Sequence, residues 1–157
     1  MKPKVYIETT IPSYLTARPS NDLRVAANQN TTIEWWETQR PCFELFISEF
    51  VTTEIIHGDS DVARKRLEII ADLPKLSINE KVRTLAKSLI SDGAIPAKAE
   101  IDAFHIAVAA VNGIEYLLTW NCAHIANAIM RTKIEGVCRR QGFEPPIICT
   151  PQELMED

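Results

Sequence analysis

Short apolar runs alternate with longer segments of helical periodicity along the chain. The runs that predict β-strands are 4–7, 43–47, a weaker one at 75–78, 114–118 and 147–149. The helical patterns between them cover about 22–39, 48–56, 60–73, 79–93, 97–112 and 126–140, with a last helical turn from Pro151, and polar turn residues follow Glu8. This alternation predicts an α/β fold, with a parallel sheet covered by helices on both faces.

The predicted helix ends carry the expected punctuation. Ser48 and Asn79 precede two of the helices as N-caps, and Asp59 or Ser60 caps the helix between them. Gly58 and Gly142 follow helices as stop signals. No internal repeat or linker divides the chain, so we expect a single domain over 1–157.

Polar residues follow the predicted strands at what should be one edge of the sheet. Right-handed crossovers place the carboxyl end of each parallel strand on the same edge, where ligand sites collect. Glu8 ends the first strand, and Thr119 and Asn121 follow the strand 114–118. Glu54 lies six residues along the helix that leaves this edge, and Asp102 opens a helix that returns to it. We therefore expect three carboxylates to converge.

The helix 97–112 is apolar around most of its circumference, which is typical of a buried helix. Its polar residues share one narrow stripe: Lys98, Asp102, His105 and Asn112. A buried carboxylate needs a partner, because an unpaired charge is unfavourable at low dielectric. Lys98 and a metal ion are both suitable partners for Asp102, and the spacing does not choose between them.

Convergent carboxylates repel one another, and a hard divalent cation relieves that repulsion. Oxygen ligands favour Mg²⁺ or Mn²⁺ over zinc. Sites of this kind usually carry out phosphoryl chemistry, because the metal polarises a phosphodiester and lowers the pKa of an attacking water.

Composition and charge narrow the class of protein. The chain has 157 residues, of which 46% are hydrophobic and 24% charged, as expected for one well-packed globular domain. The net charge of −4 does not itself favour nucleic acid as a partner. Two basic clusters nevertheless suit phosphate contacts or a solvated helix face: Arg64, Lys65 and Arg66, and Arg131, Lys133, Arg139 and Arg140.

The compartment is predicted from what the sequence lacks. It contains no run of 18 apolar residues that would span a membrane and no signal-peptide core. Cys42, Cys122, Cys138 and Cys149 lie far apart, without a C-x-x-C pair, which favours free thiols in a reducing environment. We expect a cytoplasmic protein.

Four segments in order resemble the PIN domain, and in particular the VapC-type toxin ribonucleases and allied bacterial PIN proteins. They are V-Y-I-E-T-T at 5–10, I-S-E-F-V-T-T-E-I at 47–55, D-A-F-H-I-A-V-A-A at 102–110 and L-L-T-W-N at 117–121. The resemblance implies a three-layer α/β/α sandwich with a short, mainly parallel sheet. It also implies an acidic Mg²⁺ or Mn²⁺ pocket that hydrolyses single-stranded RNA.

Carried over by position, the resemblance assigns metal ligation to Glu8, Glu54 and Asp102, with Asp102 also orienting the attacking water. Asn121 joins them as a catalytic residue. Four further residues are expected to support the site: Thr9, Thr119, His105 and His124. The resemblance makes a homodimer the expected assembly, and an antitoxin protein is the expected partner if the chain is a toxin.

The chain departs from the PIN pattern in two places. Many relatives have an acidic residue within the stretch that follows the strand 114–118, whereas here that stretch, 119–124, has none. We therefore expect weaker metal binding, or a preference for Mn²⁺ with His124 nearby. The alternative is a PIN-like module that binds nucleic acid or protein without cutting. The segment 18–40 is longer than in a minimal PIN domain, and this helical insertion is expected to cap the site or extend a dimer interface, with one of Trp35 and Trp36 in the core.

A third interpretation rests on two acid–histidine pairs. Glu54 and His57, and Asp102 and His105, are each three residues apart, as in di-iron helical bundles. Such bundles take all their ligands from helices, whereas Glu8 lies at a strand end, so this interpretation is disfavoured. We expect His57 to lie at the surface near its helix end.

Overall fold

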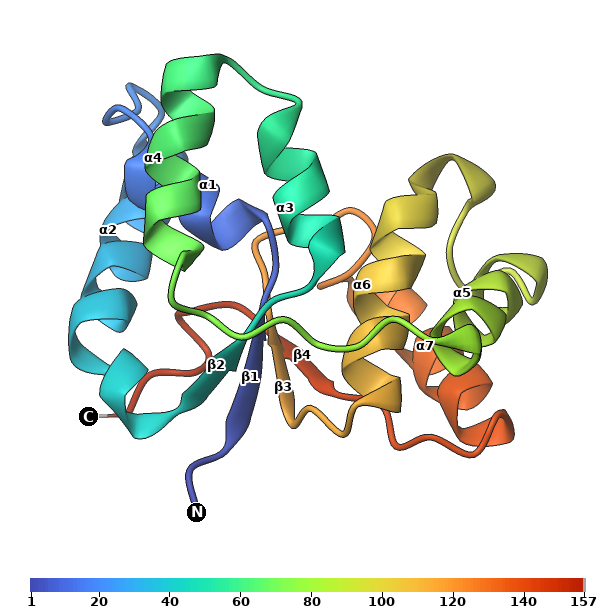
Figure 1. The fold of residues 1–157 in the computed structure, drawn as a ribbon. Helices are drawn as coiled ribbons and strands as arrows, with labels where there is room; N and C mark the ends of the chain where they lie inside the picture. Colours follow the sequence, from blue (N-terminus) through green and yellow to red (C-terminus); the bar gives the residue numbers. More distant parts are fainter. Residues whose placement is uncertain (157) are drawn as a thin grey trace.

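A four-stranded parallel sheet lies at the centre of the molecule (Figure 1), in a computed structural model that describes residues 1–156. Its strands are β1 (Lys4–Ile7), β2 (Glu44–Phe46), β3 (Tyr116–Leu118) and β4 (Ile147–Cys149), in the order β2-β1-β3-β4. Every strand pair is parallel. The expected α/β fold is confirmed, and the sheet in the described chain is entirely parallel.

Helices cover the sheet and connect its strands. They are α1 (Thr10–Thr16), α2 (Leu23–Thr38), α3 (Glu49–Ile56), α4 (Ser60–Ile70), α5 (Glu80–Ser91), α6 (Glu100–Val111) and α7 (Ala128–Arg140), with short 3₁₀ turns at Arg40–Cys42 and Ala97–Ala99. The β1-to-β2 and β2-to-β3 connections run in opposite directions across the sheet, so right-handed crossovers put them on opposite faces. The result is the three-layer α/β arrangement.

The strand β1 is central and deeply buried. Val5 pairs with Leu45 of β2 on one side and with Tyr116 of β3 on the other. Val5, Tyr6 and Ile7 are fully buried, so β1 has the continuous apolar character of a strand covered on both faces. The residue that follows β1 is therefore held at the middle of the sheet edge.

Most helix boundaries follow their predicted caps. Ser48 accepts a hydrogen bond from the backbone N–H of Phe50, and Asn79 accepts one from Val82. Asp59, one of the two predicted caps, occupies the N-cap of α4. Gly142 has a φ of +88° after α7, a conformation that favours glycine.

Two predicted elements were wrong, and a third was correct. The stretch after Glu8 forms α1, where Pro12 sits in the first turn and its missing N–H matters little. Residues 75–78 form no strand. Their one contact with the sheet is a single bridge between Lys75 and Ile47, which lies just beyond the end of β2. The segment from Pro151 forms the expected single helical turn, in which the backbone N–H of Leu154 donates to the Thr150 carbonyl at 3.2 Å.

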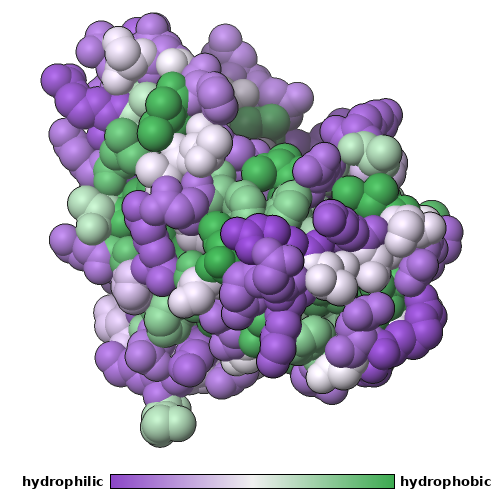
Figure 2. All heavy atoms as spheres, turned by 45° about the vertical axis from the view of Figure 1, so that its right-hand side comes forward, coloured by the Kyte–Doolittle hydropathy of each residue, from purple (hydrophilic) through white to green (hydrophobic). Residues whose placement is uncertain are grey.

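Hydrophilic residues cover most of the face drawn in Figure 2, with hydrophobic residues in small groups between them. Across residues 1–156, no helix combines the length and the apolar character needed to cross a bilayer.

Candidate active site

Glu8 occupies the centre of the carboxyl edge of the sheet. Its backbone N–H donates to Leu118 at 3.2 Å, which continues the pairing of β1 with β3. Its side chain is buried, and Oε1 accepts three hydrogen bonds: from the Thr10 N–H at 3.0 Å, the Thr10 hydroxyl at 2.5 Å and the Thr119 hydroxyl at 2.7 Å. Burial raises the pKa of Glu8, although the charge of His105 and these hydrogen bonds act to lower it.

Glu54 reaches the same edge from α3. Its Oε1 accepts hydrogen bonds from the Thr9 hydroxyl and from Nε2 of His105, both at 2.5 Å. Burial acts to raise the pKa of Glu54. The hydrogen bond and the charge of His105, together with the bond from Thr9, outweigh burial and lower that pKa. Glu54 is therefore kept as an anion.

His105 belongs to a buried chain of polar groups behind Glu54. Its Nδ1 lies 2.6 Å from the Tyr6 hydroxyl, which lies 2.8 Å from Oγ of Ser48. The backbone N–H of Phe50 donates to Oγ of Ser48, so hydrogen bonds run without a break from Phe50 through Ser48, Tyr6 and His105 to Glu54. Ser48, Tyr6 and His105 are fully buried, so this chain fixes the rotamer of Glu54.

Asp102 opens α6 and faces the loop after β3. Its Oδ1 accepts a hydrogen bond from the Asn121 amide at 3.0 Å, and Oδ2 lies 3.1 Å from Nδ1 of His124. Asn121 also accepts the backbone N–H of His124 at 3.2 Å, which closes the cluster. Within residues 1–156 Lys98 makes no ion pair with Asp102, so Asn121 and His124 replace the partner that the helix stripe suggested.

Thr119 joins the two clusters. Its hydroxyl donates to Glu8 and accepts the backbone N–H of Asn121 at 2.9 Å. The polar run after β3 is thereby tied both to the first strand and to Asp102. In Figure 1, α1, α3 and α6 lie around the upper end of the sheet; Glu54 belongs to α3 and Asp102 to α6.

The donor set around Glu8 and Glu54 fits a hard cation. One ligand atom from each of Glu8, Glu54 and His105 lies within 4.8 Å of the others. Both carboxylates commit Oε1 to protein donors, and no residue of 1–156 donates to either Oε2, which leaves two oxygens for a metal. Both nitrogens of His105 are engaged by Tyr6 and Glu54, so His105 positions a ligand without being one.

The eight predicted site residues fall into two connected clusters. One contains Glu8, Thr9, Glu54 and His105, the other contains Asp102, Asn121 and His124, and Thr119 bridges them. His57 is exposed, as expected. The sequence analysis missed Thr10, Tyr6 and the second role of Ser48. The only available signal was that all three lie in the first two motifs.

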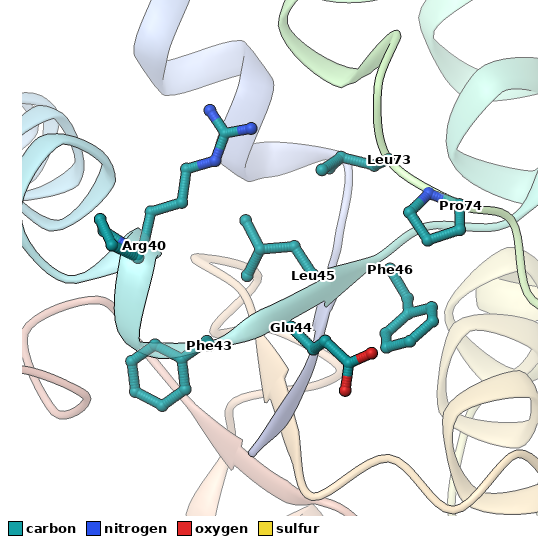
Figure 3. Close-up of a pocket in the computed structure, with 8 residues that line it drawn as sticks. Arg40, Phe43, Glu44, Leu45, Phe46, Leu73 and Pro74 are labelled. Atoms are coloured by element: carbon teal, nitrogen blue, oxygen red, sulfur yellow. The ribbon is translucent and has the colours of Figure 1, made fainter. Parts of the chain in front are cut away.

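Other predicted features take structural roles. Trp35 is fully buried and donates its indole N–H to the Leu154 carbonyl at 3.0 Å, whereas Trp36 is half-buried beside Arg40. All four cysteines are free thiols, two of them buried. A hollow of about 560 Å³ lies beside β2, lined by Arg40, Phe43, Phe46 and their neighbours (Figure 3), and none of the three carboxylates contributes to it.

Comparison with known proteins adds no identification: no family model matches the chain, and no curated protein matches it.

Proposed function

We propose that this protein is a metal-dependent endoribonuclease of the PIN type, which hydrolyses phosphodiester bonds of single-stranded RNA with Mg²⁺ or Mn²⁺. The observation that carries the proposal is the pair of carboxylates from β1 and α3, each fixed through Oε1 and free at Oε2. Their place at the carboxyl edge of a parallel sheet is where ligands bind in such folds. The resemblance of the four ordered motifs to the PIN domain supports single-stranded RNA as the substrate class.

In this proposal each residue has a stated task. Glu8 and Glu54 hold the cation through their free oxygens, while Thr9, Thr10 and Thr119 keep the carboxylates in place. A bound divalent cation supplies polarisation of the phosphodiester and a lower pKa for the attacking water. Each Asp102 oxygen accepts only one side-chain hydrogen bond and keeps a lone pair, so Asp102 can orient that water.

The test is cleavage of a mixed-sequence single-stranded RNA with Mn²⁺, with Mg²⁺ and with EDTA. Wild-type protein should cut only with metal, and Asp102→Asn should lose at least about a hundredfold in rate, as expected for loss of a positioned acid–base group. Glu100→Gln, an exposed acid in the same helical turn, is the matched control and should keep wild-type activity. Wild-type, EDTA-sensitive cleavage by Asp102→Asn would contradict the proposal.

A second function is favoured by the Asp102 cluster. Both Asp102 oxygens are engaged by Asn121 and His124, and 119–124 contains no further carboxylate. These features suit a PIN-like module that binds RNA or protein without cutting. It predicts that folded protein retains RNA yet leaves it intact with either metal, and cleavage in the same assay rejects it.

A further inference from the structure

Two aromatic side chains stack beside the carboxylates. The rings of Tyr14 in α1 and Trp120 after β3 lie 5.8 Å apart between centroids, with an interplanar angle of 12°. Nearly parallel rings at this separation form an offset stack. The two residues lie far apart in the sequence, so the fold alone brings them together.

Trp120 is held rigidly. Its backbone N–H donates to the Thr10 hydroxyl at 2.8 Å, and its indole N–H donates to the Thr32 hydroxyl at 2.7 Å. Thr32 is itself fully buried in α2 and bonded to the carbonyl of Asn28. The indole therefore cannot turn without breaking a hydrogen bond, and it forms a fixed base under the Tyr14 ring.

The stack adjoins the carboxylate site. The Thr10 hydroxyl that receives the Trp120 N–H also donates to Glu8, and Thr119, the neighbour of Trp120, does the same. Burial, and then the charges of Cys122 and Glu8, raise the pKa of Tyr14.

Tyr14 itself is only half-buried. Within residues 1–156 its hydroxyl forms no hydrogen bond, and Trp120 is its only stacked ring. The Tyr14 side chain is also absent from the set of side chains packed against the main core. A partly exposed ring backed by a fixed ring is a surface on which one more flat group can stack, and nucleobases stack on such rings regardless of sequence.

We propose that Tyr14 and Trp120 form a stacking subsite for a nucleobase next to the phosphodiester held at Glu8 and Glu54. The inference rests on the proposed function, since it gives the subsite to the same single-stranded substrate. Its ligand class is a nucleobase with no preference for a particular base, because stacking uses the π-face and not the hydrogen-bonding edge.

The experiment measures stacking separately from cleavage. A short single-stranded RNA containing 2-aminopurine, whose fluorescence falls on stacking, is titrated with protein in EDTA. The proteins are wild type, Tyr14→Leu and the matched variant Tyr14→Phe, each checked for wild-type thermal unfolding. Tyr14→Leu should weaken binding about 5- to 100-fold and abolish the quenching, whereas Tyr14→Phe should stay within about twofold of wild type.

An RNA with an abasic position provides the second arm. Wild-type protein should bind this abasic RNA as weakly as Tyr14→Leu binds the intact RNA. Tyr14→Leu should bind both RNAs with the same affinity. Quenching and affinity that are the same in Tyr14→Leu and wild type would overturn the subsite, even if the protein cuts RNA. Loss of quenching in Tyr14→Leu by a protein that never cuts would support the subsite and reject the nuclease.

Discussion

At the residue scale, Glu8 is a carboxyl group whose burial disfavours its charged form. Its pKa lies above the ordinary value of 4.5 in the folded protein, with burial as the main cause. A raised folded pKa means that the stability this group contributes is present at low pH and is lost as pH rises through the folded pKa. A carboxylate kept in this position despite that loss is typical of a functional site.

Glu8→Gln should therefore be more stable than wild type at pH 7. The amide oxygen can still accept the bonds from Thr10 and Thr119, and no buried charge remains. The gain in melting temperature should disappear below about pH 4.5, where wild-type Glu8 is protonated in both states. Thermal unfolding at both pH values checks this, with the exposed Glu115→Gln as control. A Glu8→Gln variant that is less stable than wild type at pH 7 would show that burial of the Glu8 charge does not destabilise the fold.

Tyr6 gives a second prediction at this scale. Tyr6→Phe leaves Ser48 and Nδ1 of His105 buried without their partner, so it should lower the free energy of unfolding by about 1–3 kcal/mol. Tyr116→Phe, a half-buried tyrosine on the neighbouring strand, should change it by less than about 0.5 kcal/mol. Urea unfolding of the two variants measures the difference, and equal effects would mean that the hydrogen-bonded chain is unimportant.

At the element scale, Asn127 organises the segment that carries His124. Its side-chain oxygen accepts the N–H groups of Ile129 and Met130, and its amide donates to the Cys122 carbonyl. Asn127→Ala should lower the free energy of unfolding by about 1 kcal/mol, as for other N-caps. Asn30→Ala, an exposed change inside α2, should have little effect by the same urea measurement. A neutral Asn127→Ala would mean that water replaces the cap.

The elements also mark where sequence patterns succeed and fail. The four strands were predicted because a short apolar run between polar turns is too short for a buried helix and fits a buried strand. Residues 75–78 have the same pattern, but only Lys75 finds a strand neighbour to pair with, and no local signal reports that. α1 was missed because Thr10, Pro12 and Ser13 look like turn residues when read singly.

The candidate site divides in the same way. That Glu8, Glu54 and Asp102 approach one sheet edge follows from strand order and handedness, so the sequence sufficed for their general position. Their hydrogen bonds depend on side-chain packing between elements far apart in the chain. Residue spacing does not predict that His105 bonds to Glu54. Nor does it predict that Asp102 contacts His124 and makes no ion pair with Lys98.

At the scale of the whole molecule, a bound cation should stabilise the fold. A ligand that binds only the folded state adds about 2.7 kcal/mol at a free concentration about a hundred times its dissociation constant. Mn²⁺ should therefore raise the melting temperature of wild type, EDTA should reverse the rise, and Glu54→Gln should abolish it. Glu49→Gln, an exposed acid on the same helix, should respond like wild type. An equal response in Glu54→Gln would place the metal elsewhere.

The order of strands has a consequence for the protein's own synthesis. Glu8 leaves the ribosome before Thr119, which fixes its carboxylate and is 111 positions further along the chain. The strand β1 likewise cannot form its hydrogen bonds to β3, its neighbour at the centre of the sheet, until β3 has been translated. A nascent chain therefore cannot complete the hydrogen bonds around the Glu8 carboxylate until Thr119 has been translated, so the site forms after synthesis of its first strand and not during it.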